Sequence, residues 1–503
     1  MSWNVLIDET AIAELLPVEY ARFARPVKEG LVVFLSGLPS GIQEAILAEQ
    51  AALPLRASLS ERLGLLARSC PVLHKFGQII ARDPRLAPEL RDQLRPLESL
   101  PPSANKDAVH KILVHELGPL ETRGIALSGS AIAEASVAIV VPYRDVRNRQ
   151  QREGVLKVLK PGIEERLELE LELLSRVGTH LDENCEKLSI PQIDYRDTFE
   201  QVRDKLRWEV RLDQEQRHLT EAAALYADDP DVMIPALFDP CTERGTAMER
   251  VDGVKVTDHA IRSAAGKRRL AELVARALVA HPIYSRLPRA MFHSDPHAGN
   301  LLYTHEGRLA ILDWSLVGHL GESERIAMGQ IVLAAVALDA NRIVAELTRL
   351  ANRKQVNRAV LRTVVDNWLR RIRRGQFPGM AWLVGMLDEA TQVAQLRVAS
   401  DMMLFRKLLH TVDGVINDLG ADQFRMEEAL LAEFLLHFGR ECLARWFATP
   451  TSRTFATRLS NADLAGALLG MPLAAMRFWQ AEIHDFLKRP AAKRQACKHV
   501  SNA

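Results

Sequence analysis

Three side chains near residue 300 have the types and the spacing that magnesium-dependent phosphate chemistry requires. Asp295 is followed by Asn300 at the fifth position after it, and Asp313 follows a short apolar run. Carboxylate and amide oxygens are the hard ligands that Mg²⁺ prefers, and a further carboxylate can orient an attacking hydroxyl group. Phosphoryl transfer from ATP needs these parts and little covalent chemistry from the protein. The segment therefore predicts a site for ATP and Mg²⁺.

The residues between these side chains have the pattern of a β-hairpin. Leu301-Leu302 begins an apolar strand, Glu306-Gly307 turns it, and residues 309–312 lead back to Asp313. We expect Asn300 and Asp313 at the ends of this hairpin. Taken singly, an Asp before a Pro or an Asn after a Gly is more often a turn former or a cap. The prediction rests on their order and spacing together.

The same segment permits a second chemistry. His293, Asp295 and His297 alternate like the two histidines and one carboxylate that bind iron in non-haem oxygenases. Such an enzyme needs an all-β barrel and a distant third ligand, whereas the rest of this chain has the spacing of helices. A bound metal without nucleotide would favour this alternative.

Two upstream segments add groups suited to phosphates. Lys157 lies in an alternating apolar run that ends at a Pro-Gly turn, so we expect it on a strand, where its ammonium can pair with phosphate oxygens. Ala133, Ala135 and Ser136 have small side chains that let backbone N–H groups approach phosphates. The alternatives are a surface lysine and a plain helix. Lys75 precedes Gly77-Gln78, where we expect a break in helical sequence.

Taken together, these motifs resemble the UbiB/AarF family of atypical kinases, also called the ADCK family. The matching segments are His293–Asn300 with Leu312–Ser315, the KxGQ motif at Lys75–Gln78, the alanine-rich loop at 131–137, the lysine strand at 154–158 and a hinge at 248–253. The resemblance implies that Asp295 orients the nucleophile, that Asn300 and Asp313 bind Mg²⁺, and that Lys157 binds phosphates. It also implies that Glu249 lies in the hinge at the nucleotide site.

In that family the KxGQ segment folds over the nucleotide site, which implies that Lys75 and Gln78 reach into it. The resemblance further implies a small or lipid-like phosphate acceptor, and partners among the enzymes of an isoprenoid or quinone pathway. Two function classes remain open. One is an ATP-dependent phosphotransferase or ATPase, and the other is a nucleotide-sensing scaffold that binds ATP without turnover.

One stretch departs from the family pattern. Family members carry a Glu-x-Asp pair and then a glutamate that partners the phosphate lysine. Here Lys205 and Arg207 replace the acids, and Arg211 occupies the position of the glutamate. Glu209 and Glu215 are both within reach on the amphipathic helix that we expect over 203–226, so either is a candidate partner for Lys157.

The resemblance and the apolar spacing imply an α+β, protein-kinase-like fold of two lobes, with an N-terminal helical KxGQ extension and an enlarged helical C-lobe. The boundaries we expect are 1–58 for an N-terminal helical extension, 59–120 for the KxGQ helical segment, 121–252 for the N-lobe, 253–440 for the C-lobe and 441–503 for a helical tail. The long helices we expect after residue 320 cover 322–350, 356–374, 381–417 and 426–447.

Composition narrows the functional classes. The 503 residues carry 65 basic and 64 acidic side chains, so no net charge favours nucleic acid. Five cysteines without a CxxC motif favour a reducing compartment. The N-terminus has no signal-peptide pattern, and no apolar run is long enough to span a bilayer, so we expect a cytoplasmic protein. The basic tail after the amphipathic stretch 476–487 leaves peripheral membrane contact and a solvated terminus equally open, and the oligomeric state is not predicted.

Overall fold

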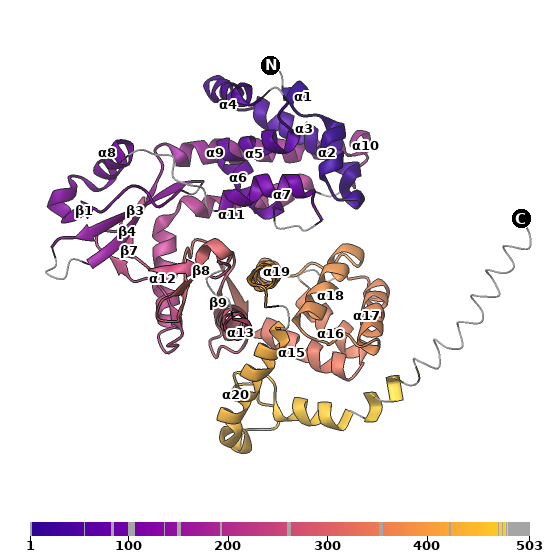
Figure 1. Cartoon of the computed structure of the whole chain (residues 1–503). Coiled ribbons are helices and arrows are strands. Elements are labelled where there is room, and N and C mark those ends of the chain that lie inside the picture. The colour runs from indigo at the N-terminus through magenta and orange to yellow at the C-terminus, as the bar shows by residue number, and fades with distance from the viewer. Residues whose placement is uncertain are drawn as a thin grey trace, which may run out of the picture. The chain divides into compact units, whose positions relative to one another are not determined.

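The computed structural model forms two compact units, each built from two separate segments of the chain. Residues 1–253 and 299–316 make up the first unit, and residues 254–298 and 317–503 make up the second. The structure describes residues 3–54, 56–81, 85–98, 106–134, 136–147, 152–191, 194–258, 263–351, 356–421, 424–470, 472–474, 476–478 and 480 (Figure 1). The basic tail beyond residue 480, to which the membrane alternative was assigned, therefore lies outside the described residues.

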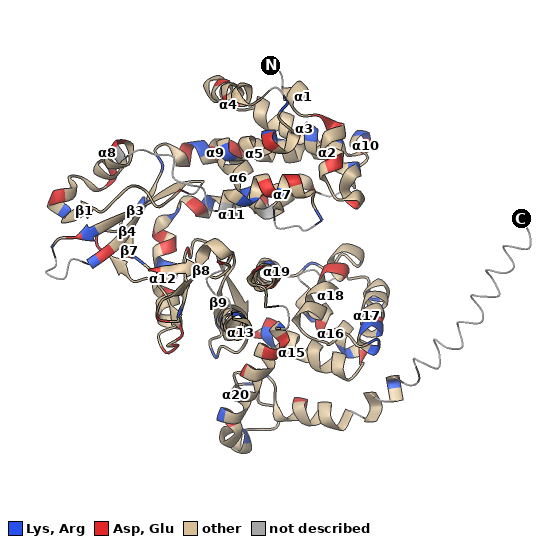
Figure 2. Ribbon diagram, in the orientation of Figure 1, with Lys and Arg blue, Asp and Glu red and all other residues tan. Residues whose placement is uncertain are grey.

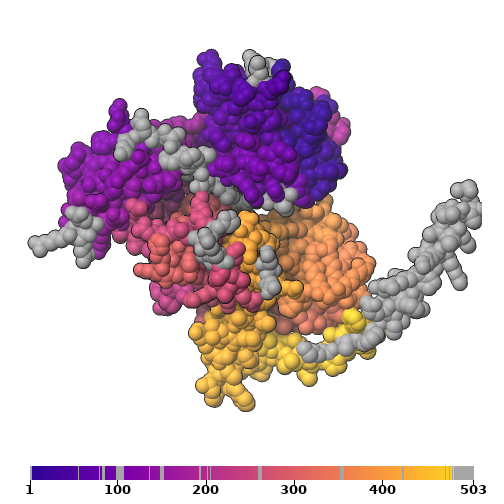
Figure 3. All heavy atoms as spheres, in the orientation of Figure 1, coloured from indigo at the N-terminus to yellow at the C-terminus, as the bar shows by residue number. Residues whose placement is uncertain are grey.

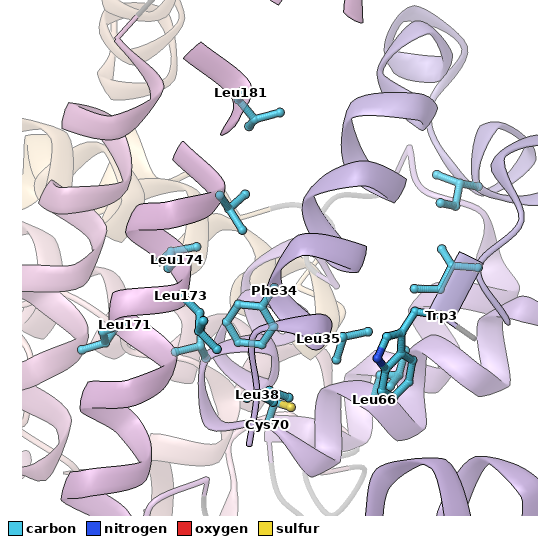
Figure 4. Packing of buried hydrophobic residues seen from close by; sticks show 14 of the residues in the cluster. Trp3, Phe34, Leu35, Leu38, Leu66, Cys70, Leu171, Leu173, Leu174 and Leu181 are labelled. Atoms are coloured by element: carbon cyan, nitrogen blue, oxygen red, sulfur yellow. The ribbon is translucent and has the colours of Figure 1, made fainter. Parts of the chain in front are cut away.

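Helices dominate the N-terminal part of the first unit. They are α1 (Trp3–Leu6), α2 (Glu9–Leu15), η1 (Val18–Phe23), α3 (Ala24–Ser36), α4 (Ser40–Ala52), α5 (Leu59–Ser69), α6 (Pro71–Ile80), α7 (Pro88–Leu94), η2 (Arg95–Glu98), α8 (Lys106–Leu117) and η3 (Leu120–Arg123). A capping box between Ser58 and Glu61 sets the start of α5. Apolar residues of α3 pack against the long helix α9 (Ile163–Glu183), where Phe34 lies beside Leu173 (Figure 4).

An antiparallel sheet follows these helices. Its strands are β1 (Ile125–Leu127), β2 (Ala133–Glu134), β3 (Ala138–Asp145), β4 (Arg152–Leu159), β6 (Leu237–Phe238) and β7 (Gly245–Glu249), in the order β1-β3-β4-β7-β6 with β2 beside β3. Lys157 is paired with Val140 on one side and Thr246 on the other, so it lies on a central strand. Central strands are fixed by hydrogen bonds on both edges, and this holds Lys157 in place.

A second, smaller sheet of the first unit contains the expected hairpin. Strands β10 (Leu301–Thr304) and β11 (Leu309–Ile311) are antiparallel, and Gly307 makes the turn with a positive φ of 82°. Strand β5 (Val232–Met233) runs parallel to β11. Strand β8 (Gly253–Lys255) lies where the chain passes from the first unit to the second.

The second unit has one strand pair, formed by β9 (Arg289–His293) and β12 (Val317–Gly321), among the residues described. Its helices are α13 (Ala264–Ala275), η5 (Arg276–Ala280), α14 (His281–Ile283), α15 (Glu322–Val336), α16 (Ala340–Leu350), α17 (Arg358–Arg373), α18 (Met380–Val393), α19 (Ser400–Leu419) and α20 (Met426–Phe447). Acidic and basic residues are interspersed along the helices of both units (Figure 2). No described helix is long and apolar enough to cross a bilayer.

Three helices that the sequence predicts as continuous are each divided into two in the structure. The helix expected over 203–226 is two helices, α11 (Tyr195–Leu206) and α12 (Leu212–Leu225), separated by the 3₁₀ turn η4 (Arg207–Val210). The helices expected over 322–350 and 381–417 are each interrupted, at residues with positive φ, Leu338 and Gln395. A residue in the left-handed conformation ends a helix. When that residue is not a glycine, the sequence does not indicate where the helix ends.

The break expected at Gly77 is also wrong, because α6 continues through it to Ile80. A Cβ atom at Gly77 would lie 2.5 Å from a methyl carbon of Leu97 and 3.2 Å from one of Leu94. The glycine therefore serves close packing of α6 against α7 and η2, where any side chain would collide.

Candidate functional site

Lys157 lies between two carboxylates in the first unit. Its Nζ is 2.8 Å from both carboxylate oxygens of Glu215 and 3.2 Å from Oδ1 of Asp313. Strand β4, helix α12 and the turn after β11 supply the three residues. The side chains of Lys157 and Glu215 are only 12% and 4% exposed, so their charges interact with little screening by water. We call these three residues the Lys157 cluster.

Burial and charge act in opposite directions within this cluster. Burial alone would lower the pKa of Lys157, but the carboxylates of Asp313 and Glu215 outweigh it and raise that pKa. Lys157 therefore stays an ammonium. Burial raises the pKa of Glu215 to about 7 against the opposing effect of Lys157, and the charge of Asp313 adds to the rise. When both carboxyl groups are ionised, one ammonium facing two carboxylates leaves an excess of negative charge, which suits the binding of a cation.

The open end of the hairpin brings Asn300 and Asp313 together. The residues next to them, Leu301 and Ile311, are paired across the strands, and the Leu312 N–H donates to the carbonyl of Asn300 at 2.8 Å. Asp313 has a φ of 54°, a left-handed conformation that costs energy outside glycine and is concentrated at functional sites. Asn300 and Asp313 therefore lie at the same end of the hairpin, each next to a residue of the last strand pair.

The residue after Asp313 fixes this turn. Trp314 is fully buried, its indole N–H donates to the carbonyl of Ile311 at 3.1 Å, and its own carbonyl lies 3.0 Å from Nδ1 of His218. His218 lies on α12 one turn after Glu215. Helix α12 therefore holds both the partner of Lys157 and the backbone that follows Asp313. No sequence motif marks His218, so only the structure reveals its contact with Trp314.

Helix α6 contributes a second lysine next to the cluster. Lys75 Nζ lies 2.5 Å from Glu209, and the charge of Glu209 is among the influences that raise the pKa of Glu215. Gln78 points elsewhere, because its amide donates to the carbonyl of Leu97 at 2.8 Å. The two glutamates left open by the sequence thus have different partners, Glu215 binding Lys157 and Glu209 binding Lys75.

The basic residues of the altered stretch find local acids. Arg207 pairs with Glu168 of α9, and Arg211 lies 3.0 Å from Asp213. Helix α12 begins directly after Arg211, whose backbone angles of −103° and 74° are not helical. This change of direction separates Glu209 from Glu215.

The residues assigned to the nucleotide lie on and beside two strands of the main sheet, β2 and β7. Ala133 is on β2, paired with Val140, and Ser136 lies in the turn between β2 and β3, whereas Ala135 lies outside the described residues. Glu249 ends β7, and its carboxylate accepts from the N–H of Ala236 at 3.2 Å. Ala133 and Ser136 are thus on a strand and a turn, not on the plain helix that was the alternative.

Asp295 belongs to the second unit, where it follows strand β9. It is 7% exposed, its N–H donates to Nδ1 of His293 at 3.1 Å, and one carboxylate oxygen lies 3.0 Å from Nζ of Lys407. Lys407 lies on α19, far along the chain, and no sequence motif marks it. Within the described part of the chain, no three His, Cys, Asp or Glu side chains gather in a metal-binding group, which a site with two histidines and a carboxylate would need.

An apolar cavity of about 410 Å³ lies among the N-terminal helices of the first unit. Helices α2, α3, α5, α6 and α7 line it, and Phe76 and Gly77 of the KxGQ segment form part of its wall. No charged side chain is among its lining residues.

Comparisons with known proteins place these residues in a family. Residues 97–347, about half of the chain, match the ABC1 atypical kinase-like domain. "Uncharacterized protein Rv0647c" of Mycobacterium tuberculosis is 31% identical over 270 residues, covering 52% of this chain and 54% of that protein. "Protein ACTIVITY OF BC1 COMPLEX KINASE 3, chloroplastic" of Arabidopsis thaliana is 29% identical over 272 residues, covering 53% of this chain and 37% of that protein.

Another relative, "Probable protein kinase UbiB" of Xanthomonas campestris, is 26% identical over 363 residues, covering 69% of this chain and 64% of that protein. The chain spans about half the length of the first curated relatives it matches. A solved Mycobacterium tuberculosis protein, in complex with erythromycin, has a TM-score of 0.49 and 16% identity over 78% of this chain and 87% of that one. The expected resemblance and the kinase-like α+β fold are confirmed, and the chain belongs to the UbiB/AarF family of atypical kinase-like proteins.

Proposed function

We propose that this protein binds ATP with Mg²⁺ and transfers the γ-phosphoryl group to water or to a small or lipid-like acceptor. The observation that carries the proposal is the Lys157 cluster, in which a buried ammonium lies 2.8 Å from Glu215 and 3.2 Å from Asp313. An ammonium held in this way can pair with phosphate oxygens, while the excess carboxylate charge attracts a cation.

The donor set at the hairpin suits magnesium. Asn300 and Asp313 offer an amide and a carboxylate oxygen at one end of β10 and β11, and Mg²⁺ is usually held by one or two such groups together with phosphates. Bound there, Mg²⁺ would supply neutralisation of the charge on the phosphates. Lys157 would bind phosphate oxygens.

Further residues are assigned to the nucleotide and the acceptor. Ala133, Ala135 and Ser136 would let backbone N–H groups approach phosphates, and Glu249, the last residue of β7, would lie near the base. Lys75 would border the site, and Gln78 would join it if its amide released the carbonyl of Leu97. Asp295 would orient the attacking hydroxyl group and take its proton. Only four residues separate Asp295 from Asn300, so the chain keeps their Cα atoms within about 18 Å of each other.

We further propose that the activity supports a biosynthetic pathway of the isoprenoid or quinone type, with other enzymes of that pathway as partners. The family membership and a relative that bears the name UbiB support this choice. The acceptor would carry a free hydroxyl group, as phosphoryl transfer requires.

A second function, a nucleotide-sensing scaffold without turnover, is favoured by the basic residues Lys205, Arg207 and Arg211 in place of acids. We rank it below turnover for a structural reason. Arg207 and Arg211 have local acidic partners, and Lys157 keeps a glutamate despite their presence.

Peripheral contact with a membrane is a separate proposal, supported by helix α20. Leu443, Trp446 and Phe447 at its C-terminal end are 78%, 82% and 92% exposed, and α20 lies at the surface of its unit (Figure 3). Exposed tryptophan, phenylalanine and leucine side chains on one helix can insert into the interface of a bilayer. Sedimentation with anionic vesicles, reduced in Trp446→Glu, would support it, and equal sedimentation of both proteins would contradict it.

The decisive experiment for the main proposal compares wild type with Asp313→Asn in ATP consumption and in ATP-induced thermal stabilisation. We expect Mg²⁺-dependent consumption by wild type alone. Equal background release from both proteins rules out turnover, and stabilisation by ATP without release would then favour the scaffold.

A further inference from the structure

Asp295 has a partner that the family domain does not contain. Nζ of Lys407 lies 3.0 Å from its Oδ1, and the side chains are 28% and 10% exposed. Lys407 lies on α19, well beyond residue 347, where the ABC1 match ends. We call these two residues the Asp295 pair.

Packing on both sides of Lys407 fixes its position. Phe405 meets Phe292 of β9 edge to face, with ring centres 5.3 Å apart, and both rings are almost fully buried. Leu408 and Val412, one and two turns further along α19, are fully buried. Helix α19 is thus anchored to the strand that leads into Asp295. The pair therefore joins two well-packed elements, unlike an ion pair between mobile surface side chains.

An ammonium in this position restricts a carboxylate in two ways. It fixes one oxygen, so that the other is presented in a defined direction, and it favours the charged state that can accept a proton. Both effects matter in phosphoryl transfer, where catalysis is mainly positioning and electrostatics. A misplacement of about 1 Å in such a group can cost about 10²-fold in rate.

We propose that Lys407 is the positioning residue of Asp295, so that the helices after the family domain complete the acceptor side of the site. The inference rests on the proposed phosphoryl transfer. In that reaction the bond from the γ-phosphorus to the β–γ bridging oxygen breaks, and its electron pair leaves with ADP. The acceptor oxygen forms the new bond to phosphorus, and its proton passes to Asp295 and then to water. Lys407 holds Asp295 for this proton transfer and itself exchanges no proton.

The test uses the full-length chain and three substitutions on α19. Lys407→Met removes the charge, Lys407→Arg keeps it with altered geometry, and Arg406→Met is the matched control. Arg406 is the adjacent basic residue, also paired with a carboxylate, Asp388, at 2.7 Å. We expect kcat of Lys407→Met to fall about 10²-fold with the ATP affinity nearly unchanged. Lys407→Arg should recover part of that loss, and Arg406→Met should behave as wild type.

A double substitution separates positioning from loss of structure. If Lys407 acts through Asp295, then adding Lys407→Met to Asp295→Asn should lower kcat no further. The double variant also leaves no unpaired carboxylate, so it should fold even where the single variant is unstable. Independent, multiplied losses would overturn the proposal, as would an unchanged or raised kcat in Lys407→Met.

The outcome also distinguishes this inference from the function on which it rests. A wild-type protein without Mg²⁺-dependent ATP turnover defeats the proposed function. A wild-type protein that turns over ATP while Lys407→Met keeps its rate defeats the positioning role alone.

Discussion

The Lys157 cluster and the Asp295 pair each hold a carboxylate beside a lysine, but different parts of the chain build them. Every member of the Lys157 cluster falls inside residues 97–347, the stretch that matches the ABC1 domain, whereas the Asp295 pair combines a residue inside it with one outside. The Lys157–Glu215 ion pair within the cluster is also the more enclosed, with Glu215 4% exposed against 10% for Asp295, whereas Asp313 is 39% exposed. The nucleotide side would thus be common to the family domain, while the acceptor side would depend on the helices added after it.

The largest expected effect separates the two sides by function. Asp313→Asn and Asp295→Asn should each lower ATP turnover about 10³-fold, since each would remove a group that the proposed reaction uses in its transition state. Only Asp313→Asn should also weaken Mg²⁺-dependent nucleotide binding, measured by calorimetry. If Asp295→Asn also weakened nucleotide binding, Asp295 would not belong to a separate acceptor side.

The second expected effect concerns stability. Lys157→Met leaves the almost fully buried carboxylate of Glu215 without its ammonium, and we expect it to lower the free energy of unfolding by about 3–5 kcal/mol. Lys407→Met leaves one partly hydrated carboxylate and should cost about 1–3 kcal/mol. Denaturant unfolding of both variants measures the difference. A larger loss of stability in Lys407→Met would show that the Asp295 pair, not the Lys157 cluster, is the less hydrated of the two.

A third effect uses pH to tell the units apart. Burial lowers the pKa of His74 on α6 to about 4, although its Nε2 lies 2.9 Å from the carbonyl of Leu97. The folded state prefers the neutral ring, so this contribution is fully present above the ordinary pKa of about 6.5 and is lost as pH falls toward 4. At pH 5.5 we expect a loss of about 1 kcal/mol.

Hydrogen exchange at pH 7.5 and 5.5 measures this effect. Amides of α6 should lose more protection at the lower pH than those of α19, whose unit contains His437 with a pKa that burial lowers, and His74→Gln should remove the excess. Equal loss in both helices would mean that the two units respond together.

The smallest expected effect is on stability, and it tests the ion pair between Lys75 and Glu209. Glu209→Gln removes the partner of Lys75, a partly exposed pair worth about 0.5–1 kcal/mol. Glu168→Gln, which removes the more exposed partner of Arg207, is the control and should change stability less. A thermal unfolding series resolves the two, and equal shifts would show that Glu209 contributes no more than a surface acid.

Sequence patterns succeeded where chemistry and spacing are local. The hairpin from Asn300 to Asp313 and the strand of Lys157 follow from alternation and turn residues over a few positions. The partner of Lys157 could not be decided, because Glu209 and Glu215 lie within one expected helix and only the 3₁₀ turn at Arg207–Val210 separates them. Lys407 was not found at all, because it has no motif and only the packing of α19 on β9 brings it to Asp295.

The breaks between helices were also not predictable from the sequence. Leu338 and Gln395 take left-handed conformations that their side chains do not favour, so apolar periodicity ran through them. At Gly77 the sequence predicted a break where the helix continues. A glycine inside a helix can mark close contact with a neighbouring helix instead of a break.

The passage of the chain between the two units, three times along its length, constrains how the protein is made on the ribosome. A nascent chain that has emerged as far as residue 253 already contains Lys157 and Glu215, but Asp313 arrives only with the segment 299–316, after residues 254–298 of the other unit have been synthesised. The first unit therefore cannot close its charged cluster during the early part of translation. During synthesis Lys157 and Glu215 therefore precede Asp313, which completes the cluster only after the segment 254–298 of the other unit has been made.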